Sequence, residues 1–198
     1  MRIIMNKLLP FTMLLLTGSL HLNAVASPNE AKVYETGEPI AKPMVMSRFV
    51  ELHNARKIKD IDFKDQQLKT VNLKQHQGKL VMVNLWATWC APCIKEIPAM
   101  QAIKARNKDN DFALVPISID EDPANIQPFF EKHGFGEYAT WIDPDKDIDY
   151  IMPADLLPAS FFLDGKGNLV GFVRGYIDWT DEGIQPYLDG LIAKYANR

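Results

Sequence analysis

The chain has 198 residues, of which 47% are hydrophobic and 24% are charged, and its formal net charge is −3. This composition is ordinary for a globular protein, and the chain contains no internal repeat or low-complexity tract. It also contains no basic run that could follow a phosphate backbone. We therefore do not expect nucleic acid as a partner.

The N-terminus predicts an exported protein. Arg2 and Lys7 form a short basic region before an apolar run at residues 8–16, and residues 24–26 form an A-x-A pattern. This order is typical of a cleaved secretory signal, and the run is shorter than the roughly 20 residues that span a bilayer. We predict a signal peptide at residues 1–26 and a periplasmic location. If the signal is not cleaved, residues 8–26 would tether the protein to the inner membrane.

The next part of the chain predicts a short helix, a hairpin and a buried strand. In the N-terminal extension, residues 27–59, apolar residues recur at helical spacing and predict a helix over residues 47–55. Residues 61–63 and 68–73 are two strand-like segments joined by a polar turn, which indicates a hairpin. Residues 80–85 (LVMVNL) are nearly all apolar, which is typical of a strand covered on both faces of a parallel sheet.

The second half alternates helices and strands. We predict a helix at residues 90–107 that contains Pro98, and a strand at residues 112–119 that contains Pro116. Asp122 and Pro123 then start a helix that stops at Gly134.

A loop carrying Trp141 is expected next, before the last three elements. These are two strands at residues 159–163 and 169–173, joined by a hairpin turn, and a final helix that starts at Thr180. The order of elements indicates a single α/β domain over residues 60–198.

Cys90 and Cys93 are the two cysteines of the chain. A bridge that closes so short a loop stabilises a fold poorly, so the pair needs a chemical reason. Cys90 stands where a strand ends and a helix begins, and there unpaired N–H groups and the helix dipole lower a thiol pKa. Cys93 lies one turn later on the same face, within disulfide distance. This C-x-x-C pattern indicates thiol–disulfide exchange.

A zinc site is the main alternative for a cysteine pair. Zinc usually takes four ligands, and the chain has no second thiol pair. His53, His76 and His133 lack the spacing of metal ligands. We therefore expect no metal at Cys90 and Cys93, and no cofactor.

The segment VNLWATWCAPCIKEIPAM, residues 83–100, resembles the active-site segment of thioredoxin-fold proteins. More narrowly, it is similar to the exported TlpA/ResA/DsbE-like thiol–disulfide oxidoreductases. Asn84 stands where cytosolic thioredoxins have a buried aspartate, and Glu96 and Pro98 follow Cys93 as in the exported group. Residues 157–160 (LPAS), followed by FFLDGKGNLVG, resemble the cis-proline loop and hairpin of these proteins. The resemblance runs from about residue 61 to the C-terminus.

The resemblance implies a thioredoxin-like α/β fold: a central mixed sheet flanked by helices, with an N-terminal hairpin and an extra strand–helix insertion. It also implies roles for single residues. Cys90 would be the attacking thiol and Cys93 the resolving thiol. Pro158 would be a cis-proline beside the disulfide, and Leu157 would offer backbone hydrogen bonds to an extended substrate.

Two further side chains have implied roles at this site. Trp89 would lie on the substrate-binding rim. Glu96 would be a buried acid that relays thiol protons, with a solvated helix carboxylate as the alternative.

The residues between the cysteines predict the direction of the reaction. Ala91 and Pro92 carry no charge that would stabilise a thiolate, and a carboxylate at Glu96 would oppose one. We predict a reductase with a potential of about −220 to −270 mV. In an oxidising compartment it would need a membrane electron donor. The resemblance implies protein disulfide substrates, with the cysteines of apocytochrome c as an example.

Two other function classes remain open. A peroxiredoxin-like thiol peroxidase would share the fold, but Thr88 lies two residues before Cys90 instead of the three that such enzymes use. A non-catalytic copper or metal chaperone would need soft ligands beyond the two sulfurs, and Met152 is the one methionine near the expected cis-proline loop. Peroxide consumption and copper(I) binding would distinguish these classes.

Overall fold

Strand β5 (Leu80–Trp86) lies at the centre of the sheet, and all seven of its residues are buried. It pairs in parallel with β6 (Phe112–Ser118) and antiparallel with β8 (Ala159–Leu163), so the sheet is mixed, as expected. The computed structural model describes residues 32–136, 138–153 and 155–198. The predicted signal peptide lies outside these ranges.

The sheet has nine strands among the described residues, in the order β1-β2-β9-β8-β5-β6-β7-β3-β4. The other strands are β1 (Lys32–Glu35), β2 (Val50–Lys57), β3 (Asp62–Lys64), β4 (Thr70–Asn72), β7 (Trp141–Ile142) and β9 (Asn168–Arg174). The helices are α1 (Ala91–Arg106), α2 (Ile126–His133), α3 (Ile148–Ile151) and α4 (Ile184–Tyr195). The described ranges also contain three short 3₁₀ helices, η1 (Met44–Met46), η2 (Leu73–His76) and η3 (Pro123–Asn125). No helix in the described ranges is long and apolar enough to cross a membrane.

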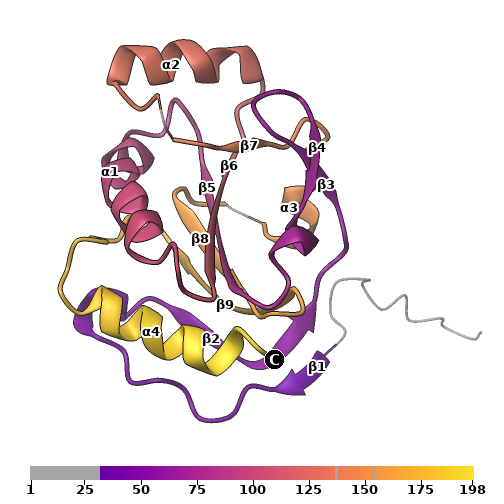
Figure 1. Ribbon diagram of the computed structural model, residues 1–198, viewed down its shortest axis with the longest axis vertical. Coiled ribbons are helices and arrows are strands. Elements are labelled where there is room, and N and C mark those ends of the chain that lie inside the picture. The colour runs from indigo at the N-terminus through magenta and orange to yellow at the C-terminus, as the bar shows by residue number, and fades with distance from the viewer. Residues whose placement is uncertain (1–31, 137, 154) are drawn as a thin grey trace, which may run out of the picture.

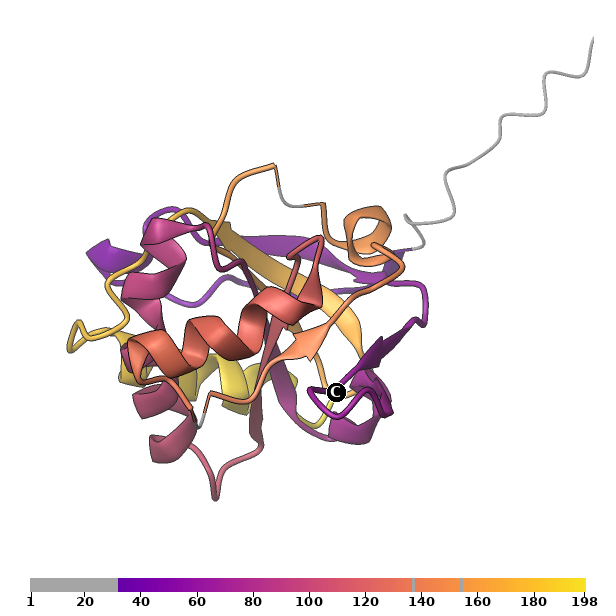
Figure 2. The same cartoon turned by 90° about the horizontal axis from the view of Figure 1, so that it is seen from above.

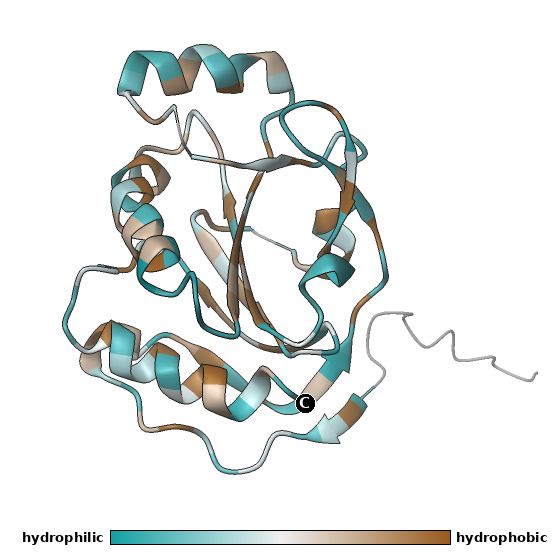
Figure 3. Cartoon of the chain, in the orientation of Figure 1, coloured by the Kyte–Doolittle hydropathy of each residue, from teal (hydrophilic) through white to brown (hydrophobic). Residues whose placement is uncertain are grey.

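The two faces of β5 pack into two separate cores, because successive side chains of a strand point to opposite faces. Leu80, Met82 and Trp86 join the buried residues of α1, α2 and α4. Val81, Val83 and Leu85 join those of α3 and β3. Figure 1 accordingly shows α1 and α4 on one side of the central strands and α3 on the other. The central strands are largely hydrophobic in Figure 3.

Helix α2 lies at one end of the molecule, at the top of Figure 1 and toward the viewer in Figure 2. Asp122 caps the preceding turn by accepting a hydrogen bond from the Ala124 N–H at 3.0 Å. The helix ends at Gly134, whose φ of 72° is left-handed, as the sequence predicted. Its buried residues Ile126 and Phe130 join the same core as Trp86.

The predicted helix at residues 47–55 is wrong. The segment follows the 3₁₀ helix η1, which ends at Met46, and contains most of strand β2, which lies between β1 and β9 in the sheet. Phe49 is buried and makes edge contacts with Phe162 and Tyr187, at centroid distances of 5.1 and 5.8 Å. Pairing with strands distant in the sequence therefore overrides the helical spacing of the apolar residues.

The predicted start of the last helix is also wrong, because α4 begins at Ile184 and not at Thr180. The Asp178 carboxylate accepts hydrogen bonds from the N–H and hydroxyl of Thr180, and Asp181 accepts one from the Gly183 N–H. Such local turns compete with the helix. The segment expected as a loop after α2 contains β7 and α3, which are too short to predict from periodicity.

The remaining predicted elements are confirmed within a few residues. β3 and β4 form the antiparallel hairpin, and β8 and β9 are joined across the turn at residues 164–168. Strands β1 and β2 come from the segment predicted as an N-terminal extension, and they continue the sheet beyond β9.

Candidate active site

Cys90 is the N-cap residue of α1, four residues after β5 ends at Trp86. It forms a disulfide with Cys93, with a Cα–Cα distance of 5.3 Å. The Cys93 N–H points at the Cys90 sulfur, 3.3 Å away. Pro92 lies in the first turn, where a helix needs no N–H donor. The start of the helix therefore presents the Cys93 N–H and a positive dipole end to this sulfur, which favours a thiolate when the pair is reduced.

The two tryptophans of the motif have different surroundings. Trp86 is buried, donates its indole N–H to the Thr140 hydroxyl at 2.9 Å and stacks on Phe130. Trp89 is 67% exposed and directly precedes Cys90. Trp86 is therefore part of the core, whereas Trp89 is available to a partner beside the disulfide.

Asp120 fixes the loop before Cys90, and sequence analysis did not single it out. Its carboxylate accepts hydrogen bonds from the N–H and the hydroxyl of Thr88, at 3.0 and 2.6 Å, and from the Ser118 hydroxyl at 2.7 Å. Asp120 follows β6, which runs parallel to β5, so both strands end at the same edge of the sheet. This position at the carboxyl end of a strand was the signal that could have identified it.

Glu96 lies one helical turn after Cys93 and is only 3% exposed. The Ile177 N–H donates to its Oε1 at 2.7 Å, and its Oε2 has no hydrogen-bond partner among the described residues. Burial raises the pKa of Glu96 to about 7, against the lowering effects of the Ile177 N–H, the Trp179 and Asn84 side chains and the Arg48 charge. Of the two alternatives that the sequence left open, the structure has the buried acid.

The Leu157–Pro158 peptide bond is cis. Ala159, the next residue, is paired with Leu85 near the end of β5, so the proline lies at the edge of the sheet from which the cysteine loop leaves. The Gly175 N–H donates to the Pro158 carbonyl at 2.7 Å. Asn84 donates to the Ser160 hydroxyl at 3.1 Å, which ties the strand after the proline to β5.

The described ranges contain no group of three or more His, Cys, Asp or Glu side chains that could hold a metal ion. His53 and His133 are exposed, and His76 stacks on Trp141. Met152 is buried in the core that contains α3. Each of these four side chains therefore either packs against other residues or faces the solvent.

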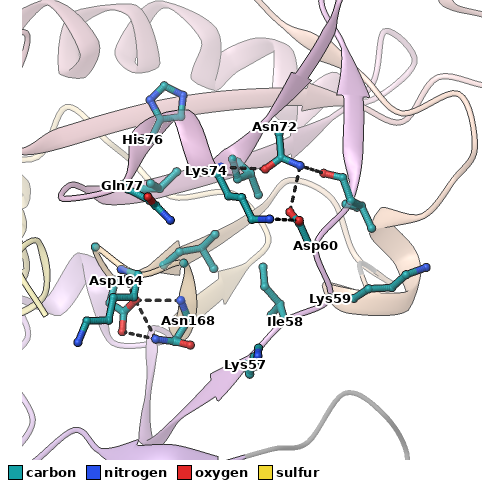
Figure 4. A pocket seen from close by; sticks show the side chains of 17 residues that line it. Lys57, Ile58, Lys59, Asp60, Asn72, Lys74, His76, Gln77, Asp164 and Asn168 are labelled. Atoms are coloured by element: carbon teal, nitrogen blue, oxygen red, sulfur yellow. Dashed lines mark hydrogen bonds and ion pairs between the residues drawn. The ribbon is translucent and has the colours of Figure 1, made fainter.

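A cavity of about 380 Å³ lies at the other end of the sheet, between residues 57–61, residues 72–77 and the turn at residues 164–168 (Figure 4). Its lining contains no cysteine. Asp164, on its wall, is held by Asn168 and Tyr34. Lys74 is paired with Asp60. The disulfide chemistry is therefore located away from this cavity.

A disulfide at the start of the helix after the central strand, with a cis-proline at the same edge and a buried acid one turn away, defines a thiol–disulfide oxidoreductase with a thioredoxin-like fold. The model of the AhpC/TSA family matches residues 55–171. The thiol–disulfide oxidoreductase ResA of Bacillus thuringiensis (strain Al Hakam) is 31% identical over 124 residues, which cover 63% of this chain and 70% of the relative.

Solved structures agree on the fold. A secreted thiol–disulfide isomerase from Corynebacterium glutamicum has a TM-score of 0.61 at 19% identity, covering 82% of this chain and 98% of that one. A structure named as a thiol:disulfide interchange protein DsbE, from Chlorobium tepidum, has a TM-score of 0.60 at 22% identity, covering 68% and 94%. The chain belongs to the AhpC/TSA family and, within it, to the TlpA/ResA/DsbE group of thiol–disulfide oxidoreductases.

Proposed function

We propose that the protein is an exported reductase of protein disulfides, in which Cys90 attacks the substrate and Cys93 resolves the intermediate. The observation that carries this proposal is the surroundings of the pair. The Cys93 N–H is directed at the Cys90 sulfur, and Glu96, one turn further, is a buried acid with a free oxygen. The first feature favours a nucleophile at Cys90, and the second provides a proton acceptor near Cys93.

In the first step, the Cys90 thiolate attacks one sulfur of the substrate disulfide. A bond forms between Cys90 and that sulfur, and the other substrate sulfur leaves as a thiolate. The exposed Trp89 ring and the Leu157 backbone beside Pro158 would hold the substrate chain in an extended form next to the sulfur.

In the second step, Glu96 takes the proton of the Cys93 thiol, and the Cys93 thiolate attacks the Cys90 sulfur. The bond between Cys90 and the substrate sulfur breaks, and this sulfur leaves as a thiolate that is then protonated. Two electrons have passed to the substrate, and Cys90–Cys93 is oxidised. This oxidised state is the one in the structure. With a pKa of about 7, Glu96 can accept and return a proton near neutral pH.

The groups around the two thiols indicate whether the protein reduces or oxidises its substrates. Ala91 and Pro92 add no positive charge, and a negative charge at Glu96 would oppose thiolates. We expect a potential of about −220 to −270 mV, which favours reduction of other disulfides. Export through residues 1–26 would place the protein where a membrane electron donor must reduce it again. Apocytochrome c is then a candidate substrate, and normal levels of c-type cytochromes after gene deletion would remove it.

The deciding experiment is a redox titration of Cys90–Cys93 in thiol buffers, followed by tryptophan fluorescence. A midpoint near the thioredoxin value of about −270 mV would support a reductase, whereas a value near −120 mV, as in strong oxidants, would make the protein a disulfide donor.

Because the chain matches the AhpC/TSA family, a thiol peroxidase is the second candidate function. A copper(I) chaperone is the third. We expect no consumption of peroxide with a thiol donor, since Thr88 is bound to Asp120. Copper(I) bound in the presence of competing thiol would favour the chaperone.

A further inference from the structure

Residues 174–177, which we call the strap, begin at the last residue of β9 and pass the active-site end of the sheet. Two backbone N–H groups of the strap bind active-site residues. The Gly175 N–H donates to the carbonyl of Pro158 at 2.7 Å, and the Ile177 N–H donates to Glu96 at 2.7 Å. The strap therefore connects the cis-proline to the buried acid, although Ile177 and Glu96 are 81 positions apart.

The other side of the strap is held by Arg48, which lies between η1 and β2. Its guanidinium donates to the carbonyl of Arg174 at 3.2 Å and to the carbonyl of Tyr176. The planar fork of arginine suits two acceptors at once, which a lysine ammonium matches poorly.

Gly175, between these two carbonyls, leaves the space that the guanidinium needs. Its φ is +79°, and a Cβ atom there would lie 2.8 Å from Nη1 of Arg48. The positive φ therefore favours glycine at this position, and a side chain there would displace the guanidinium from its two acceptors.

The charged and polar groups around Glu96 come from several elements. Asn84 lies on β5, Trp179 and the Ile177 N–H follow β9, and Arg48 precedes β2, and all of these act to lower the Glu96 pKa. The phenol pKa of Tyr138, before β7, is raised by burial and, to a smaller extent, by the charge of Glu96. Cys93 lies one turn earlier on α1 itself. Arg48 is the one cation that acts on Glu96 in this set.

We infer that Arg48 is a positioning residue of the active site: it fixes the strap, so that the Ile177 N–H stays on Glu96 and the Gly175 N–H stays on Pro158. The N-terminal segment before β2 thereby acts on the proton acceptor. This inference rests on the proposed role of Glu96. Arg48 touches neither sulfur in the structure and acts through the strap and through its charge.

The test is a carboxyl titration of Glu96 by ¹³C NMR in the oxidised protein, with the signal assigned by its loss in Glu96→Gln. In Arg48→Gln we expect the midpoint to rise by about half a pH unit or more, because a hydrogen bond is loosened and a positive charge is removed. Arg48→Lys keeps the charge but loses the fork, so we expect an intermediate midpoint. Arg56→Gln, an exposed arginine of β2 with the same charge change, is the matched control and should titrate as the wild type.

Identical midpoints in Arg48→Gln and Arg56→Gln would overturn the inference. If Arg48→Gln does not fold, as judged by circular dichroism, Arg48→Lys against the wild type decides the question, and an unchanged midpoint again overturns it. The titration uses no substrate. Absence of disulfide reductase activity would therefore overturn the proposed function while leaving this measurement valid.

Discussion

Two buried carboxylates at opposite ends of the sheet show how a structural carboxylate differs from one that we propose to transfer protons. Asp164 and Glu96 are 1% and 3% exposed. Both oxygens of Asp164 accept hydrogen bonds, from the Tyr34 hydroxyl and from the N–H groups of Lys166 and Asn168. The Asn168 amide also donates to this carboxylate (Figure 4). Glu96 has the Ile177 N–H on one oxygen and no hydrogen-bond partner on the other within the described ranges.

The difference lies in how the charge is compensated. A carboxylate that accepts several hydrogen bonds is stabilised in its charged form and holds its surroundings in place. A buried carboxylate with one donor favours its neutral form, so it can exchange a proton near neutral pH. The turn at residues 164–168 is thus held rigidly, and the surroundings of Glu96 suit the proton transfer that we propose for it.

The largest expected effect is at the disulfide itself. In Cys90→Ala, the rate of reduction of a fluorescent disulfide-bonded peptide should fall by at least about a thousandfold, because the nucleophile is gone. Asp164→Ala, at the other end, should keep its rate per folded molecule. A residual rate in Cys90→Ala close to that of the wild type would mean that Cys93 alone carries the chemistry.

The second effect is a change in the pH dependence of stability. The pKa of Glu96 is raised from 4.5 to about 7 by folding, so its contribution to stability is complete below pH 4.5 and is lost as the pH rises to 7. At about 1.4 kcal/mol per pH unit, the wild type should lose about 3 kcal/mol relative to Glu96→Gln between pH 4 and pH 8. Guanidinium unfolding of both oxidised proteins measures this difference. Parallel pH profiles would show that Glu96 titrates normally.

The third effect is confined to the structural end. Asp164→Ala leaves the N–H groups of Lys166 and Asn168 without their acceptor, which should cost about 2 kcal/mol of unfolding free energy and lower the Tm by about 4 to 8 °C. Asp164→Asn keeps an acceptor oxygen and should lose less. The midpoint potential of the cysteines should stay unchanged in both variants, and a shift would show that the two ends are coupled.

The smallest effect is at the exposed tryptophan. Trp89→Ala should raise the KM for a peptide disulfide by up to about tenfold, with unfolding free energy changed by less than about 0.5 kcal/mol, since the ring packs little in the free protein. Val33→Ala, which also removes an exposed apolar side chain, is the control on edge strand β1. An unchanged KM would exclude Trp89 from the binding surface.

The sequence predicted the elements whose signals are local. The apolar run of β5, the amphipathic α1 and the glycine-rich turn at residues 164–168 each carry their own pattern, and each is confirmed. Strand β2 was misassigned because its apolar spacing suits a helix, and only pairing with β1 and β9 decides for a strand. Strand β1, strand β7 and helix α3 were missed because each has at most four residues, which is too few to show a periodic pattern.

The candidate site also combines features that are local in the sequence with features that depend on the fold. The position of Cys90 at a helix start follows from adjacent residues, and so does the spacing to Cys93. The burial of Glu96 depends on Ile177, and the contacts of Arg48 and Asp120 depend on segments that only the fold brings together. No local pattern could have predicted the contacts of Glu96 and Arg48, whereas the position of Asp120 just after a buried strand was a usable signal.

The sheet pairing of β2 has a consequence for how the protein is made. Strand β2 is among the first structured segments to be synthesised, but its partner β9 is close to the end of the chain. Pairings between distant segments slow folding, since a long loop must close before they form. During synthesis of the chain, the cysteines therefore emerge before Arg48, Glu96 and the strap can meet. The nascent thiols are then open to oxidation by other proteins. They acquire their tuned reactivity only after about the last hundred residues, which include β9 and the strap, have been synthesised.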